Sequence, residues 1–320
     1  MIALLRSGFS TKRSRNGLWG VPLAIVVVMV AVLTVGTDQF ATRENLFNLV
    51  AQAMPLLIAA IGQLFVILVG GLDLSIGSVI SFSTAILSLN GPATVLIPAV
   101  FISAGLIGLI NGLVITRLNV HPIIATLAMQ YILLGITRIL RPVSGGDIPQ
   151  VVIAAVQGRF LGLPLPVFWG IIVIGLAAKV LYGTRFGLHL FGIGGGVAAG
   201  MEDAARNFGI RVDRNIVLAY VACSLFAALA GVFLAGRIVS GDPNVGLLFE
   251  LDAITAVAIG GTQLSGGVGS LHGTALGAVI LALLANGMNM ANISPFVQTA
   301  IKGGLLLAIV GLQSRKKMGL

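Results

Sequence analysis

Long apolar segments alternate with short polar connections along most of the chain. A membrane-spanning helix needs about 20 mostly apolar residues, and fewer where it is broken inside protein. The pattern predicts an all-α integral membrane protein, a polytopic bundle of about ten transmembrane helices that forms a single domain over residues 1–320. The second, third and eighth segments are short, and the eighth fits a half-helix. The predicted spans are Leu18–Gly36, Gln52–Val69, Leu74–Leu89, Val95–Thr116, Ile123–Leu140, Val167–Tyr182, Ile216–Ala235, about Asp252–Ile259, Leu271–Met288 and Phe296–Leu312.

Composition supports this fold and leaves few residues for catalysis. The chain is 57% hydrophobic and 9% charged, whereas soluble domains carry about 25% charged residues. Its one cysteine, Cys223, excludes a disulfide framework. The three histidines, His121, His189 and His272, are isolated in the sequence. We therefore expect no metal site and no catalytic residues, and a membrane enzyme, which would need clustered His, Asp or Glu, is disfavoured.

The net charge of +9 follows membrane topology rather than a nucleic-acid surface. Positive residues are spread between the apolar segments, and cytoplasmic loops of membrane proteins are enriched in Lys and Arg. With the N-terminus inside the cell, thirteen Lys and Arg residues lie on the cytoplasmic side and five outside. Residues 1–17, 183–215 and 313–320 are therefore predicted to be cytoplasmic, and no nucleic-acid partner is expected. The apolar run after Arg15 is predicted to be a retained first helix.

Two features are predicted for the outer side of the membrane. Thr42, in the loop Asp38–Ala51, fits the cap of a short amphipathic helix on the membrane surface. Glu250 and Asp252 stand at the start of the eighth span. Because a helix N-terminus stabilises carboxylates, we expect these two residues to shape the periplasmic mouth or to meet a partner, rather than to coordinate an ion.

The pattern Gly-Gly-x-x-Leu-Ser-x-Gly occurs twice, at residues 70–77 and 260–267. Paired glycines break helices, and a serine hydroxyl can cap the helix that follows. A helix broken at membrane depth offers free amide and carbonyl groups to a polar solute, as transport pathways do. The alternative is a tight cytoplasmic turn between packed helices, with Asp73 solvated or capping. The residues concerned are Gly70, Gly71, Asp73, Ser75, Gly260, Gly261 and Ser265.

A few polar side chains lie inside the predicted spans and are candidates for the substrate pathway. Uncharged amides suit a neutral hydroxylated solute better than an ion, although hydrogen bonding between helices would also account for them. Asn286 and Asn289 are three residues apart and are predicted to share a helix face. Lys302 is the deepest charge; it is a functional candidate by default, or it snorkels or pairs with a carboxylate. The candidates are Gln63, Gln130, Asn286, Asn289 and Lys302.

The cytoplasmic stretch 183–215 is predicted to contain a short helix, Met201–Phe208, closed by Gly209. Its charges match the helix dipole, with two acids in the first turn and a base in the last. A helix of about two turns is marginal in water by itself, so we expect it to dock on a partner or on this protein's own helices. Its charged residues are Glu202, Asp203 and Arg206, and its apolar face comprises Ala204, Ala205 and Phe208.

The energy source for transport is not evident within the chain. No G-x-x-x-x-G-K-[ST] motif occurs, and no series of Asp, Glu and His suggests proton transfer through the spans. An ion-coupled secondary transporter of a small polar solute would need paired intramembrane carboxylates and is the alternative function. An external energy source fits the sequence better.

Several segments resemble, in order, the permease subunits of bacterial ABC importers of the ribose/xylose/galactose and autoinducer type. The resemblance rests on residues 45–79, on "PIIATLAMQYILLGITR", on "TRFG" at 184–187, on "AARNFGI" at 204–210 and on "ELDAITAVAIGGTQLSGGVGS" at 250–270. It implies a multi-pass permease of the inner membrane that pairs with a second permease copy or paralogue, surrounded by lipid. It also implies two cytoplasmic ATPase subunits, which bind ATP–Mg while this chain binds no cofactor, and a soluble sugar-binding protein outside. In such permeases the segment ending in Ala-Ala-Arg-x-x-Gly-Ile is similar to the element that docks on the ATPase.

Overall fold

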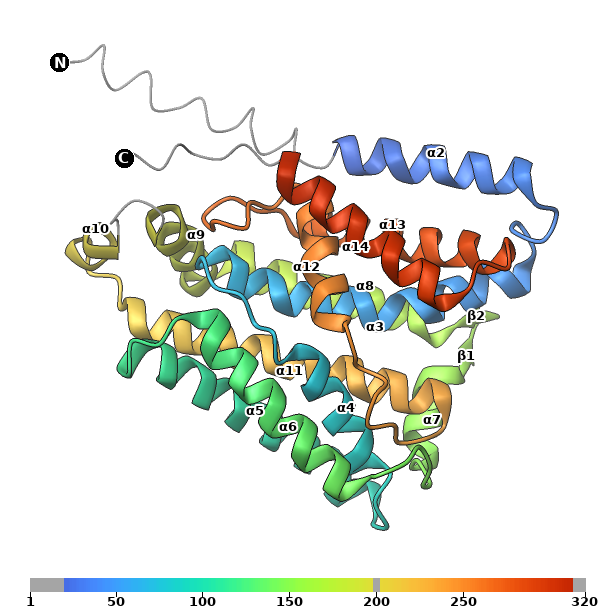
Figure 1. The fold of residues 1–320 in the computed structure, drawn as a ribbon, viewed down its shortest axis with the longest axis horizontal. Coiled ribbons are helices and arrows are strands. Elements are labelled where there is room, and N and C mark those ends of the chain that lie inside the picture. Colours follow the sequence, from blue (N-terminus) through green and yellow to red (C-terminus); the bar gives the residue numbers. More distant parts are fainter. Residues whose placement is uncertain (1–19, 198–201, 313–320) are drawn as a thin grey trace.

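The computed structural model describes residues 20–197 and 202–312, which form helices joined by short connections (Figure 1). One short hairpin, β1 (Arg159–Phe160) with β2 (Leu163–Pro164), interrupts them. The all-α membrane fold is therefore confirmed for the described residues. The helices are α2 (Gly20–Gly36), α3 (Arg43–Leu68), α4 (Ile76–Leu87), α5 (Ala93–Arg117), α6 (Pro122–Leu140), α7 (Gln150–Gln157), α8 (Leu165–Gly183), α9 (Arg185–Val197), α10 (Glu202–Asn207), α11 (Val212–Ile238), α12 (Phe249–Ile259), α13 (Leu271–Met290) and α14 (Pro295–Leu312).

Six of the described helices, α3, α5, α6, α8, α11 and α13, are long and apolar enough to cross a membrane. The apolar helices α2, α4 and α14 are shorter, and α12 has 11 residues. Each predicted span thus contains a helix, and the short third and eighth spans correspond to the short helices α4 and α12. The number of about ten crossings stays a prediction.

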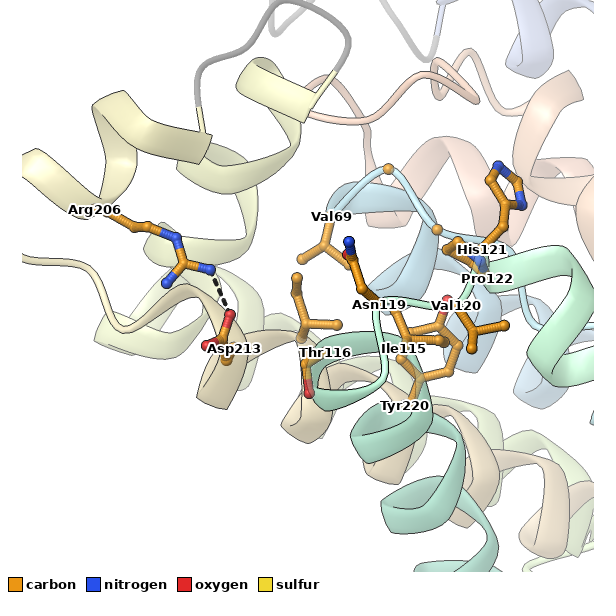
Figure 2. A pocket seen from close by; sticks show the side chains of 13 residues that line it. Val69, Ile115, Thr116, Asn119, Val120, His121, Pro122, Arg206, Asp213 and Tyr220 are labelled. Carbon is orange, nitrogen blue, oxygen red and sulfur yellow. Dashed lines mark hydrogen bonds and ion pairs between the residues drawn. The ribbon is translucent and has the colours of Figure 1, made fainter.

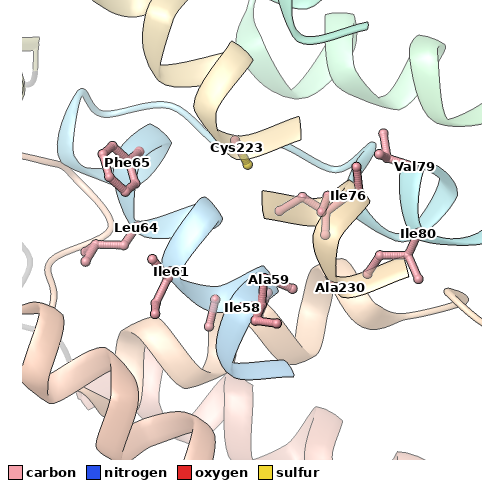
Figure 3. Close-up of a cluster of buried hydrophobic side chains, with 14 of the residues drawn as sticks. Ile58, Ala59, Ile61, Leu64, Phe65, Ile76, Val79, Ile80, Cys223 and Ala230 are labelled. Carbon is pink, nitrogen blue, oxygen red and sulfur yellow. The ribbon is translucent and has the colours of Figure 1, made fainter. Parts of the chain in front are cut away.

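The centre of the bundle is built around α3 and α11. Small residues let their backbones approach neighbouring helices, as is usual in membrane proteins. A side chain at Gly108 or Gly112 of α5 would meet the α11 backbone, and one at Gly231 of α11 would meet α4. Figure 3 shows the apolar side chains that α3, α4 and α11 contribute to this core. The core therefore holds the start of α4 firmly against α3 and α11.

The loop predicted to carry a separate amphipathic helix does not do so. Thr42 caps a helix as expected, since its Oγ1 accepts a hydrogen bond from the backbone N–H of Asn45 at 3.4 Å. That helix, however, continues without interruption from Arg43 to Leu68 through Pro55. The surface helix and the second span are therefore one 26-residue element, α3.

Candidate functional site

The first Gly-Gly motif is an extended segment inside the bundle. After α3 ends, Gly70 takes a φ of +80°, a conformation open to glycine, and α4 begins only at Ile76. Backbone groups buried in this way need partners. Thr126 of α6 supplies two: its Oγ1 accepts from Leu74 N at 3.1 Å and donates to Leu72 O at 3.3 Å. The segment is thus a helix break held by side chains of neighbouring helices.

Asp73 is fully buried in this break. The alternative that placed Asp73 in solvent, in a tight cytoplasmic turn, is therefore wrong. Its Oδ1 accepts from the N–H of Ser75 at 2.9 Å and from the Ser75 hydroxyl at 2.6 Å. The same hydroxyl accepts from Asn111 Nδ2 at 3.0 Å. Because its hydroxyl serves Asp73, Ser75 does not cap α4 through its side chain, contrary to expectation.

Gln63, a pathway candidate, has a structural role here. With its amide oriented to satisfy both groups, it accepts from Asp73 N at 3.2 Å and donates to Asp73 O at 3.3 Å. Its side chain is fully buried. Gln63 therefore completes the backbone hydrogen bonding of the break, together with Thr126, which the sequence analysis did not select as a site residue.

The second Gly-Gly motif contacts the first. Gly261 repeats the φ of +80°, and Gly267 N donates to Leu68 O at 3.0 Å. A Cβ atom at Gly266 would lie 2.9 Å from the Cα of Gly70 and 3.0 Å from the Cα of Gly194 in α9. Both motifs and helix α9 therefore meet at one point, which we call the glycine junction (Gly70, Gly194, Gly266 and Gly267).

Gly260 and Ser265 of the second motif do not have the environments that the sequence predicted. A side chain at Gly260 would meet the backbone of Gly273 in α13. Ser265 is exposed, and the residue that caps α13 is Ser270, whose Oγ accepts from Gly273 N at 3.1 Å. The predicted capping role of Ser265 is therefore wrong, and the motif ends in a loop before the helix begins.

The half-helices α4 and α12 begin next to each other in the middle of the molecule (Figure 1). A Cβ atom at Gly77 would meet both Glu250 Oε2 and the carbonyl of Gly246. Glu250 is 5% exposed, and its Oε1 accepts from Gln130 Nε2 at 3.2 Å. Glu250 therefore lies inside the bundle rather than at an exposed outer mouth.

The other polar candidates for the substrate pathway, Lys302, Asn286 and Asn289, contact different helices and do not lie together. Lys302 of α14 forms an ion pair with Asp252 at 2.6 Å, so it pairs with a carboxylate rather than snorkelling. Asn286 exchanges hydrogen bonds with Asn45 of α3, at 2.8 and 3.3 Å. Asn289 is exposed and accepts from Gln298 Nε2 of α14 at 2.8 Å. The two asparagines of α13 therefore face different helices and do not form one binding face.

The predicted coupling helix is present as α10, and Gly209 follows it with a φ of +78°. Arg206 pairs with Asp213 at 2.6 Å. Ala205 is buried in this chain's own core, whereas Phe208 is 86% exposed. Ala205 therefore packs on this protein's own helices, which was the alternative to docking on a partner, and Phe208 is an exposed apolar residue at this end. Met201 and the side chains of Glu202, Asp203 and Ala204 lie outside the described residues.

A pocket of about 310 Å³ lies between the first Gly-Gly turn, the α5–α6 connection and the α10–α11 segment (Figure 2). Its polar lining includes Asn119, His121, Tyr220 and the Arg206–Asp213 pair. Sequence reasoning missed this pocket because its residues come from separate segments. Across the described residues, no three His, Cys, Asp or Glu side chains gather as a metal site would require.

Comparisons with known proteins agree with this architecture. Residues 45–310 match the family described as branched-chain amino acid transport system / permease component. The ribose import permease protein RbsC of Escherichia coli K12 is 35% identical over 92% of this chain and 93% of the relative. RbsC of Bacillus subtilis 168 is also 35% identical, over 92% of this chain and 91% of the relative. The galactose/methyl galactoside import permease protein MglC of Escherichia coli K12 is 31% identical over 99% and 98%.

No solved structure matches the chain. The matches to the family and to its curated relatives nevertheless extend over most of the sequence and include both Gly-Gly motifs. They confirm the resemblance inferred from the residues. The chain belongs to the branched-chain amino acid transport system / permease component family.

Proposed function

We propose that this chain is the membrane permease subunit of an ATP-driven importer and forms the pathway for a monosaccharide or a similar small hydroxylated solute. The observation that carries the proposal is the similarity to ribose and galactose import permease proteins over more than nine-tenths of the chain.

The proposed assembly has four kinds of component. Cytoplasmic ATPase subunits bind ATP–Mg and supply the energy, and a sugar-binding protein outside delivers the solute. A second permease copy or paralogue completes the pathway, and lipid surrounds the pair. This chain contributes about ten crossings of the inner membrane, with both termini in the cytoplasm, and no catalytic residue.

The glycine junction offers a physical route from the ATPase to the pathway. Gly194 of α9 lies against Leu68, the last residue of α3 before the first turn, and against Gly267 near the end of the second motif. The first turn leads into α4, and the second motif begins directly after α12. Since backbone packs on backbone there, a displacement of α9 is transmitted to both half-helices without flexible side chains between them. The half-helices adjoin at Gly77 and Glu250, where their movement would open or close the pathway.

The alternative function, ion-coupled secondary transport, also has some support from the structure. Asp73 and Glu250 are carboxylates buried within the bundle, and buried intramembrane carboxylates are a feature of ion-coupled transporters. Both are held by hydrogen bonds to neighbouring residues, Ser75 and Gln130. The ATP-driven importer remains the better supported function because it also accounts for the family membership.

The first experiment is purification of the permease after co-expression with candidate ATPase and binding-protein genes from the same genome. We expect the ATPase to remain bound through detergent extraction and size-exclusion chromatography. Recovery of the permease in a folded, monodisperse form without any ATPase, under several mild detergents, would contradict the proposed assembly.

Topology gives a separate test. A cysteine replacing Thr42 is expected to react with a membrane-impermeant thiol reagent added outside intact cells, and one replacing Phe208 only after the membrane is permeabilised. Both positions are exposed, and the native Cys223 is fully buried and should give no background. Labelling of Phe208→Cys in intact cells would reverse the proposed orientation.

A further inference from the structure

The strongest feature outside the glycine junction is a partly exposed ion pair on two apolar helices. Lys302 Nζ lies 2.6 Å from Asp252 Oδ2, and the two side chains are 26% and 20% exposed. Lys302 lies about 10 Å along α14, at a rise of 1.5 Å per residue, and the whole helix is about 27 Å long. The pair is therefore well inside the helix rather than at its end.

An exposed ion pair at this position does not suit a lipid-facing surface. Charged side chains inside membrane helices are costly, and they face the bundle interior or a water-filled cavity in almost all cases. Asp252 also belongs to α12, the half-helix that begins inside the bundle beside α4. The exposed side of the pair consequently faces either the solute pathway or another protein surface that carries polar groups.

The surroundings of the pair combine charge with apolar surface. In the segment that ends in the first turn of α12, Leu247, Leu248 and Leu251 are 65%, 37% and 40% exposed. Monosaccharides present hydroxyl groups along their edges and C–H groups on their faces. Asp252 can accept hydrogen bonds from hydroxyl groups and Lys302 can donate to them, and such charge-assisted bonds are stronger than neutral ones.

The connection that leads into α12 also has an unusual backbone conformation. The connection between α11 and α12 starts at Val239 and ends at Leu248, which have φ values of +53° and +67°. Residues other than glycine rarely adopt this region, and a β-branched residue such as Val239 does so less readily still. Such conformations persist only where the surrounding structure enforces them, and they gather at functional sites. The connection is thus held in a defined shape that presents Asp252.

We infer that the Asp252–Lys302 pair is a solute-binding element of the pathway wall, which exchanges its internal hydrogen bond for bonds to the hydroxyl groups of a passing monosaccharide. This inference rests on the proposed function and deepens it. It assigns the pair a role in transferring solute rather than in assembling the complex or hydrolysing ATP.

The test uses the complete transporter, with its ATPase and binding protein, reconstituted in liposomes. The neutral variants Asp252→Asn and Lys302→Gln remove the charge of each side chain and leave a polar amide of similar size that can still form hydrogen bonds. Thr299→Val is the matched control, because Thr299 lies one turn away on α14 and, within the part of the chain that the structure describes, bonds to its own helix at Pro295 O. Uptake of a panel of labelled pentoses and hexoses, ribose and galactose included, is measured together with ATP hydrolysis.

We expect both neutral variants to assemble with the ATPase and to keep its stimulation by the loaded binding protein. Sugar imported per ATP hydrolysed should fall about tenfold, which corresponds to about 1.4 kcal/mol, while the control stays unchanged. An unchanged ratio in both neutral variants would overturn the inference, and so would failure of both to assemble, because the pair would then only fix α12 to α14. If the unaltered transporter imported no sugar of the panel, the result would contradict the proposed function of monosaccharide import itself.

Discussion

Replacing Gly194 by alanine is expected to uncouple ATP hydrolysis from uptake. A methyl group at this position would overlap the carbonyl oxygen of Leu68 and the backbone N–H of Gly267. Both are main-chain groups, and they already form a hydrogen bond with each other at 3.0 Å. Neither can rotate away as a flexible side chain would, so α9 must move off the glycine junction.

The expected size of this effect follows from the cost of overpacking. Inserting a methyl group into a tightly packed site costs about 1–3 kcal/mol, so uptake per ATP hydrolysed should decrease about 5- to 150-fold at about 1.4 kcal/mol per tenfold change. ATP-driven uptake and ATP hydrolysis are measured on the same reconstituted sample. A structural defect alone would lower both rates together, whereas loss of coupling lowers uptake more than hydrolysis.

Gly192→Ala is the matched control for this prediction. Gly192 lies two residues earlier on α9, and a Cβ atom there would meet only the Cδ1 of Ile210, at an ordinary contact distance of 3.6 Å. Both variants change the helix propensity of α9 in the same way. If Gly192→Ala and Gly194→Ala had the same effect on coupling, the glycine junction would not transmit the movement.

A second large effect is expected at the exposed end of α10. Phe208 is 86% exposed at the end of the bundle assigned to the cytoplasm, and buried aromatic residues dominate the binding energy of many interfaces. Phe208→Asp should weaken binding of the ATPase about 30-fold or more, since hot-spot residues contribute about 2 kcal/mol or more. Pull-down of the ATPase at a series of concentrations measures this change.

Two neighbouring positions sharpen this prediction. Asn207→Ala changes an exposed residue beside Phe208 and should leave ATPase binding within about fivefold, as most interface substitutions cost under about 1 kcal/mol. Ala205→Glu would place a charge in this chain's own core, so we expect loss of the folded permease rather than a selective loss of binding. Normal ATPase binding by Phe208→Asp would exclude Phe208 as the docking residue.

The apolar pattern predicted much of the fold because it reports directly on which segments can be buried in a membrane. It placed α13 and α14 close to their observed bounds, and it recognised the third and eighth spans as short. It could not show that α3 begins at Arg43, since the amphipathic start of that helix resembles a surface element. Asn45 in the first turn of α3 pairs with Asn286 across 241 positions of sequence, a contact that periodicity does not reveal.

The candidate site was harder to predict, because the sequence does not distinguish a polar residue that faces water from one that is buried in the protein interior. The connection 239–248 has the composition of an outer loop, yet it folds along α4. Thr84 Oγ1 donates to Asp242 O and accepts from Asp242 N, both at 3.1 Å, and Ser81 Oγ accepts from Gly246 N at 2.9 Å. These bonds satisfy the backbone inside the bundle and bring Glu250 to Gly77. Pairings between distant segments of this kind are set by the tertiary packing.

Uptake into liposomes tests the central claim that this chain imports a monosaccharide at the expense of ATP. The permease is reconstituted with its ATPase, the binding protein is added outside, and ATP is enclosed, with no Na⁺ or H⁺ gradient. We predict that labelled sugar accumulates with enclosed ATP and does not accumulate with a non-hydrolysable analogue. Accumulation by the permease alone, driven by an ion gradient in ATP-free liposomes, would contradict the claim and establish the ion-coupled alternative.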